Sequence, residues 1–319
     1  MPLQSPRADD LRVIRSLCQF MSRQRDGCAT VQDVSDFLSK IGNRANGHEW
    51  KRSRIYHYTS AACELKLAEK ASFHTFALTS LGYQLANIHP EAQLETPLSQ
   101  NEKILISTLL ISSKIVADYL ALYMPTGRPP KTVTEFIQRG KPIRIVRSDN
   151  GQFVLTSASS KCITLDKSQK RSLAWTLFNW LRALDLADHV YKEDVDSFLF
   201  WEREEVRVFY PIRKRSVTPQ VIKKMILDRT EAHDNDICLL YIPDLLVNLC
   251  ANEGIPKGEF LNTLVRLYQH EPSSFHLEIM SSLRSDNRCK AHYGYLNFPV
   301  VNGIMRSHVC VTNQKGARR

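Results

Sequence analysis

Residues 48–88 of this 319-residue chain have the sequence HEWKRSRIYHYTSAACELKLAEKASFHTFALTSLGYQLANI, and the fold of the first part of the chain depends on this stretch. It begins with a segment of helical length that mixes cations with aromatic residues. Two strand-length runs then flank the polar residues 71–75, which predicts a hairpin. Thr79 and Ser80 can each cap a following helix, because their hydroxyls accept hydrogen bonds from its first free amides. The predicted order is therefore helix, strand, hairpin tip, strand, helix.

Two more helices are predicted before this stretch. Residues 9–22 place apolar side chains at spacings of three and four, the pattern of an amphipathic helix. A second helix is predicted from residue 30, where Thr30 and Asp33 have the spacing of a capping box. The sequence Ile-Gly-Asn at 41–43 predicts the end of this helix.

Three helices followed by a two-stranded hairpin resemble the winged helix-turn-helix superfamily. The run Phe-Ala-Leu-Thr-Ser-Leu-Gly at 76–82 is similar to the strand-to-helix junction that closes the wing in many bacterial members. The resemblance covers residues 1–90. It implies that the third helix, from residue 47 or 48 to residue 65, is the recognition helix and that the hairpin is the wing.

The resemblance also implies contacts with double-stranded DNA. In a major groove, Arg can bridge the acceptors of guanine, while Lys and Tyr bind phosphates. The candidate DNA-binding residues on the third helix and the wing are Lys51, Arg52, Arg54, Tyr56, His57, Tyr58, Ser72 and His74. The alternative is a solvated helix face on a winged helix that binds protein, because the fold alone does not decide function.

The charge of the chain favours a polyanionic partner. The net charge is +10 and the pI is near 9.2. Residues 99–215 are the most basic part, with 19 Lys and Arg against 13 Asp and Glu. Runs of charge are also typical of solvated surfaces, so both interpretations stay open here. The further candidate phosphate contacts are Arg128, Lys131, Lys141, Arg144, Lys170, Arg171, Arg213, Lys214 and Arg215.

The pattern of strand, loop and return strand recurs later in the chain and resembles further winged-helix units, so the chain is divided into three regions. They are an N-terminal winged helix at 1–90, a central helical region with a second winged-helix-like unit at 99–215, and a C-terminal winged-helix-like unit at 216–319. A linker is predicted at 89–99, and a helix that is apolar on more than one face is predicted at 100–123. The expected fold class is α+β, mostly helical, with two or three winged-helix units joined by a long central helix.

Signatures of catalysis and of cofactor binding are missing from the sequence. No GxxxxGK[ST], GxSxG or HExxH motif occurs. The eight cysteines include no CxxC pair, which favours free, mostly buried thiols in a reducing compartment. Cys289, His292, His308 and Cys310 have ligand-like spacing for zinc, but buried thiols and surface histidines explain them more simply. We therefore expect no enzyme, no cofactor and no metal.

No run of eighteen apolar residues occurs, and the first residues lack the apolar stretch of a signal peptide, which favours a cytoplasmic protein without a membrane partner. The expected function is non-catalytic binding of double-stranded DNA. The protein would be a bacterial or archaeal regulator, or the DNA-recognising subunit of a defence or mobile-element system. The competing interpretation is an architectural subunit in a larger nucleoprotein complex. Its apolar helix at 100–123 would then bind a protein partner or a second copy of the chain.

Overall fold

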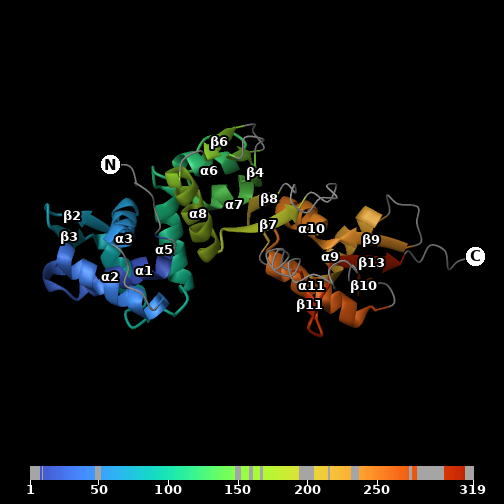
Figure 1. Ribbon diagram of the computed structural model, residues 1–319, viewed down its shortest axis with the longest axis horizontal. Helices are drawn as coiled ribbons and strands as arrows, with labels where there is room; N and C mark the ends of the chain where they lie inside the picture. The colour runs from blue at the N-terminus through green and yellow to red at the C-terminus, as the bar shows by residue number, and fades with distance from the viewer. Residues whose placement is uncertain are drawn as a thin grey trace, which may run out of the picture. The chain divides into compact units, whose positions relative to one another are not determined.

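The chain is a mixed α+β protein with about 52% helix, eleven α-helices and several small sheets within its described residues (Figure 1). It divides into two compact units, which are described separately. The first unit holds residues 1–139 and 164–187, and the second holds 140–163 and 188–319. The computed structural model describes residues 8, 10–46, 52–147, 152–157, 161–165, 168–193, 205–214, 216–230, 237–272, 275–278 and 298–312.

The first unit begins with four α-helices and a small sheet, drawn in blue to teal in Figure 1. The elements are α1 (Leu11–Ser22), β1 (Cys28–Thr30), α2 (Val31–Asn46), α3 (Arg52–Glu64), β2 (Ala68–Lys70), β3 (Thr75–Leu78) and α4 (Ser80–Ile88). The antiparallel sheet has the order β1-β3-β2. Helix α1 packs against α2, α3 and α4. Its apolar stripe is almost fully buried, since Leu11, Ile14, Leu17, Cys18 and Met21 are each at most 1% exposed.

Two of these helices begin at the residues that the sequence predicts, and local hydrogen bonds cap their first turns. The Asp33 carboxylate accepts from the Thr30 amide at 3.0 Å, and the Thr30 hydroxyl accepts from the Asp33 amide at 3.1 Å. This reciprocal pair is the predicted capping box of α2. The Thr79 hydroxyl accepts from the Gly82 amide at 3.1 Å, which confirms Thr79 as the N-cap of α4.

Helix α2 does not end at residues 41–43, so that prediction is wrong. It continues through Gly42 to Asn46. A single glycine inside a helix costs only about 1 kcal/mol. Leu38 and Ile41 are 0% and 7% exposed, so packing of the helix against the core offsets that cost.

The prediction of one long central helix at 100–123 is also wrong. The segment forms two helices, α5 (Gln100–Ile111) and α6 (Ala117–Tyr123), separated by a turn. Ser112 and Ser113 begin the turn, and their amides donate to the carbonyls of Thr108 and Leu110. Serine competes for backbone hydrogen bonds outside helices, which favours a break at this point.

Helices α7 (Val133–Arg139) and α8 (Ser168–Ala183) complete the first unit. Tyr123 of α6 contacts Phe136 of α7 edge to face, with ring centroids 5.2 Å apart. The indole Nε1 of Trp180 on α8 donates to the carbonyl of Ala8 at 2.6 Å. Trp180 and its neighbour Phe178 are 3% and 2% exposed, so both are core residues, as expected for large aromatics on a helix.

The second unit contains a five-stranded sheet with the order β6-β5-β4-β8-β7. Its strands are β4 (Ile143–Arg147), β5 (Phe153–Ser157), β6 (Cys162–Leu165), β7 (Ala187–Glu193) and β8 (Glu205–Pro211), and the boundary between the units falls within β6 and β7. The sequence predicts four of these strands, at 143–146, 153–155, 186–191 and 206–211, and it does not predict β6. Tyr210 of β8 donates its hydroxyl to the carbonyl of Ile255 at 3.0 Å. The sheet thereby joins the core of the C-terminal elements.

The C-terminal part of the second unit packs helices against a three-stranded antiparallel sheet of order β10-β13-β9. Ile222, Leu246, Phe260 and Leu264 are at most 2% exposed and belong to its core. The elements are α9 (Pro219–Thr230), β9 (Ile237–Tyr241), α10 (Ile242–Leu245) continued by a π-helix (Leu246–Ala251), α11 (Lys257–His270), β10 (Phe275–Glu278), β11 (Val300–Val301), β12 (Ile304–Met305) and β13 (His308–Thr312).

In the part of the chain that the structure describes, no helix has the length and apolar character needed to cross a membrane. The seven described cysteines are free, as predicted, but only Cys18, Cys238 and Cys250 are buried. The expectation of mostly buried thiols is therefore wrong for these residues. The division into domains at 1–90, 99–215 and 216–319 stays a prediction.

Candidate nucleic-acid interface

Helix α3, the predicted recognition helix, combines an exposed tyrosine with a buried part among its described side chains. Tyr56 is 51% exposed, whereas His57 and Tyr58 are 6% and 0% exposed. Ala61 and Ala62 are fully buried, since this end of α3 packs against α1 and α2. His57 and Tyr58 are therefore core residues, and the prediction that they contact DNA is withdrawn.

The cations predicted for this helix lie at its beginning. Arg52 and Arg54 belong to the first turn of α3, and position 52 precedes Tyr56 by one helical turn. Their side chains and the whole of Lys51 lie outside the described residues.

The β2–β3 hairpin ends in a tip formed by residues 71–74. The Ser72 amide donates to the carbonyl of Thr75 at 3.2 Å, and the His74 amide donates to the Ser72 hydroxyl at 3.3 Å. Ser72 and His74 are both exposed, as a contact with DNA requires. Phe73 lies between them and, at 78% exposed, is the most exposed large hydrophobic residue within the described ranges.

Phe73 has a cation and a histidine beside its ring. The Lys70 Nζ lies 4.8 Å from the ring centroid. The His74 ring meets the Phe73 ring edge to face, with centroids also 4.8 Å apart. Sequence reasoning missed Phe73, because a phenylalanine beside a strand is usually a core residue. Its position inside a polar hairpin tip was the signal that could have identified it.

Hydrogen bonds fix the hairpin to the helices on both sides. The Thr79 hydroxyl donates to the carbonyl of Lys66 at 2.7 Å, and the Thr79 amide donates to the carbonyl of Leu67 at 3.1 Å. At the tip, the carbonyl of His74 accepts from the Val31 amide at the start of α2 at 2.9 Å. Helix α3 and the hairpin are therefore parts of one rigid surface.

The other predicted basic residues are divided between the two units. Arg128, Lys131 and Lys170 are exposed in the first unit, and Lys141 and Arg144 are exposed in the second. The side chain of Arg171 and the whole of Arg215 lie outside the described part of the chain. These residues stay candidates for phosphate contacts.

The side chains of Arg213 and Lys214 form hydrogen bonds and an ion pair within the second unit. The Arg213 guanidinium donates to the carbonyls of Asn252 at 2.8 Å and Gly140 at 2.7 Å. The Lys214 Nζ forms an ion pair of 2.6 Å with the Glu253 carboxylate. Arg213 connects three segments of the fold, so the prediction that this pair binds phosphate loses its support.

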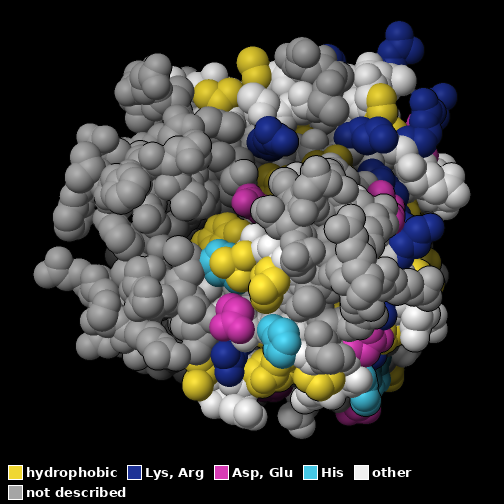
Figure 2. Space-filling model, turned by 90° about the vertical axis from the view of Figure 1, so that its right-hand side faces the viewer, with side chains coloured by type: hydrophobic (Ala, Val, Ile, Leu, Met, Phe, Trp, Pro, Cys, Tyr) yellow, Lys and Arg dark blue, Asp and Glu magenta, His cyan; other side chains and the backbone are white. Residues whose placement is uncertain are grey.

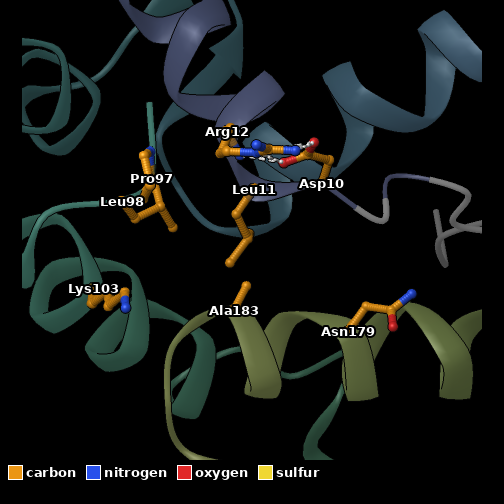
Figure 3. A pocket seen from close by; sticks show the side chains of 8 residues that line it. All are labelled: Asp10, Leu11, Arg12, Pro97, Leu98, Lys103, Asn179 and Ala183. Carbon is orange, nitrogen blue, oxygen red and sulfur yellow. Dashed lines mark hydrogen bonds and ion pairs between the residues drawn. The ribbon is translucent and has the colours of Figure 1, made fainter. Parts of the chain in front are cut away.

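A pocket of about 460 Å³ opens in the first unit at the start of α1 (Figure 3). Figure 3 shows Leu11 and Ala183 pointing toward each other across it. Its two cations already have acidic partners, since Arg12 pairs with Asp10 at 2.8 Å and Lys103 pairs with Asp185 at 2.6 Å. The pocket therefore offers no unpaired charge on these residues for a ligand.

The structure describes two of the four residues that have ligand-like spacing for zinc. The described residues contain no group of three or more His, Cys, Asp or Glu side chains that could hold a metal ion. Cys289 and His292 lie outside those residues. His308 and Cys310 are on β13, and the Nδ1 of His308 lies 2.9 Å from the Ser307 hydroxyl.

His308 provides a pH-dependent contribution to stability. It lies with Tyr241, Asp244 and Arg229 around a pocket of about 330 Å³. Figure 2 shows one face of the molecule, on which hydrophobic, histidine and acidic side chains lie close together. Burial lowers the pKa of His308, and the charge of Asp244 opposes this with a smaller effect. The folded state therefore takes up a proton at lower pH than the unfolded state does. This contribution is fully present above about pH 6.5 and is lost as the pH falls below that value.

We expect the His308→Gln variant to lose less stability than the parent when the pH is lowered from about 7.5 to about 5.5, because glutamine does not titrate. Urea midpoints of both proteins at the two pH values give the difference. Equal losses would show that His308 does not contribute to the acid sensitivity.

Comparisons with protein-family models, with curated proteins and with solved structures give no match to this chain. A functional assignment therefore depends on the geometry of its own residues. That geometry combines the exposed Tyr56 of α3 with a hydrogen-bonded hairpin whose tip carries Ser72, Phe73 and His74.

Proposed function

We propose that this chain is a non-catalytic protein that binds double-stranded DNA through a winged helix-turn-helix formed by α1–α3 and the sheet β1-β3-β2. The observation that carries the proposal is the element order α1-β1-α2-α3-β2-β3 with β3 as the central strand. In this proposal α3 is the recognition helix, and the exposed β2–β3 hairpin that follows it is the wing. The net charge of +10 supports a polyanionic partner.

In this proposal the start of α3 supplies both affinity and base recognition. Lys51, Arg52 and Arg54 bring three positive charges to a helix terminus that is itself electropositive. Neutralising phosphates releases condensed counterions, which gives affinity without sequence information. Arginine is also the side chain best suited to guanine in the major groove, and the exposed Tyr56 can bind a phosphate on the same helix.

We expect the Lys51→Ala/Arg52→Ala/Arg54→Ala variant to bind a random duplex at least about tenfold more weakly at 0.1 M salt, with a salt slope that decreases by about one for each lost phosphate contact. Fluorescence anisotropy of a labelled duplex of about 30 base pairs across a salt series measures both quantities. A matched control removes three exposed charges from other elements, as Arg25→Ala/Lys114→Ala/Arg182→Ala.

The two triple variants have the same net charge, so they separate a local site from a general effect of charge. Equal affinities of the two variants would move the site away from α3. Absence of duplex binding by the parent at low salt would refute the proposed function itself. Binding of single-stranded DNA or RNA alone would refute recognition in a groove.

The architectural alternative loses the feature that favoured it. The surplus apolar surface expected at 100–123 is divided between α5 and α6 and is mostly buried within the first unit. Ile104, at 56% exposed, is the one large hydrophobic residue of these two helices that is exposed. A single exposed side chain does not make an interface for a protein partner or for a second copy of the chain.

A further inference from the structure

Phe73 is exposed in a setting that does not suit a protein partner. The other residues of the tip are Ala71, Ser72 and His74, so Phe73 is the single large apolar side chain there. Protein interfaces bury contiguous apolar surface, which one side chain on a polar hairpin cannot provide. A planar ring beside cationic and hydrogen-bonding groups is instead the chemistry that binds nucleobases next to phosphates.

The charges around Phe73 also favour a nucleic-acid ligand. Lys70 has its ammonium nitrogen 4.8 Å from the ring centroid, and residues 71–75 include no carboxylate. Successive side chains of a strand point to opposite faces, so Glu69 projects away from the face that Lys70 occupies. A ring that projects from the tip therefore approaches its ligand together with a positive charge.

The hairpin also holds Phe73 in place before any ligand binds. Residues on both sides of it are fixed, because the Ser72 amide donates to Thr75 at 3.2 Å and the His74 carbonyl accepts from Val31 at 2.9 Å. A rigid tip loses little conformational freedom on binding, and this favours insertion of its side chain. Apolar side chains that enter the minor groove in this way unstack a base step and bend the duplex.

We propose that Phe73 inserts between base pairs from the minor groove of the duplex that α3 binds, with Lys70 and His74 at the flanking phosphates. The inference rests on the proposed DNA-binding function and adds a distortion of the duplex to it. The hairpin tip then acts as a wedge that selects DNA steps by how easily they unstack.

The test uses the 319-residue chain and a duplex of random sequence. In the Phe73→Trp variant, the added indole is expected to lose at least about half of its fluorescence when the duplex saturates the protein, because it stacks on bases. The parent protein supplies the background of its four native tryptophans. Ile104→Trp, at another exposed apolar position of the same unit, is the matched control and is expected to show no such loss.

A second variant, Phe73→Ala, is expected to bind the duplex about tenfold more weakly with an unchanged salt slope, because stacking is lost and phosphate contacts are kept. A duplex labelled at both ends is expected to show less bending with this variant than with the parent. Steeply salt-dependent binding by the parent, together with an unquenched Phe73→Trp and an unaffected Phe73→Ala, would overturn the wedge and leave the proposed function intact. No duplex binding by the parent would overturn both.

Discussion

Replacing Arg15 by alanine is expected to lower the free energy of unfolding of the first unit by about 3–5 kcal/mol. The side chains of Arg15 and Glu102 are both 0% exposed, and the Arg15 Nη1 lies 3.8 Å from the Glu102 carboxylate. Burial lowers the pKa of Arg15, and the charge of Glu102 partly restores it. Removing the guanidinium leaves the buried Glu102 carboxylate without its counter-charge. An uncompensated buried charge strongly destabilises the folded state.

Arg15 also holds the segment that the sequence predicts as a linker. Its guanidinium donates to the carbonyls of Gln93 at 2.5 Å and Pro97 at 3.5 Å. The amide group of Gln19, one turn along α1, donates to the carbonyl of His89 at 2.7 Å. Residues 89–99 are therefore packed on α1 rather than forming a free connection. We expect the alanine substitution to release this segment as well.

Trp175 and Trp180 lie on α8 in the same unit, so their fluorescence during urea unfolding reports on this part of the chain. Arg12→Ala is the matched control, because Arg12 lies on the same helix and pairs with Asp10 at 2.8 Å but is 42% exposed. Exposed ion pairs contribute about 0–1 kcal/mol, so the control is expected to remain close to the parent. Equal effects of the two substitutions would contradict a structural role for the buried pair.

The local elements of the fold were predictable because local residues determine them. The capping box of Thr30 and Asp33 and the cap at Thr79 depend on neighbours within three residues, and the structure confirms both. Strand β1 was not predictable in this way. It has three residues and pairs Cys28 with Ala77, far along the chain, so its existence depends on the tertiary fold.

The candidate site was predictable only in part, for a similar reason. Residue type indicates where cations and polar hairpin tips lie, which identified Ser72 and His74. It does not tell which face of a helix is buried when aromatic and charged residues are mixed, so His57 was assigned to the surface although it is 6% exposed. The partners of Arg213 are backbone carbonyls. Every residue has a backbone carbonyl, so residue types alone do not predict these hydrogen bonds.

Gly82→Ala is expected to lower the stability of the first unit by about 2–3 kcal/mol, because α4 approaches the base of the hairpin closely at this residue. A Cβ atom there would overlap the backbone carbonyl oxygen of Leu67 and would lie 2.6 Å from the Leu78 Cδ1. That carbonyl accepts from the Thr79 amide at 3.1 Å, so it cannot move without breaking the bond that fixes the hairpin. The gain of about 1 kcal/mol from replacing a helical glycine by alanine is too small to offset the overlap.

Gly258→Ala on α11 is the matched control, since a Cβ atom there meets no atom within 4 Å. It is expected to be neutral or stabilising by up to about 1 kcal/mol. Urea unfolding followed by circular dichroism compares both variants with the parent. Because Gly82 determines how closely α4 supports the hairpin, its variant is also expected to weaken duplex binding under conditions where it is still folded. Equal stability of the two variants would show that the hairpin base tolerates displacement, and the rigid surface on which both DNA proposals depend would lose its physical basis.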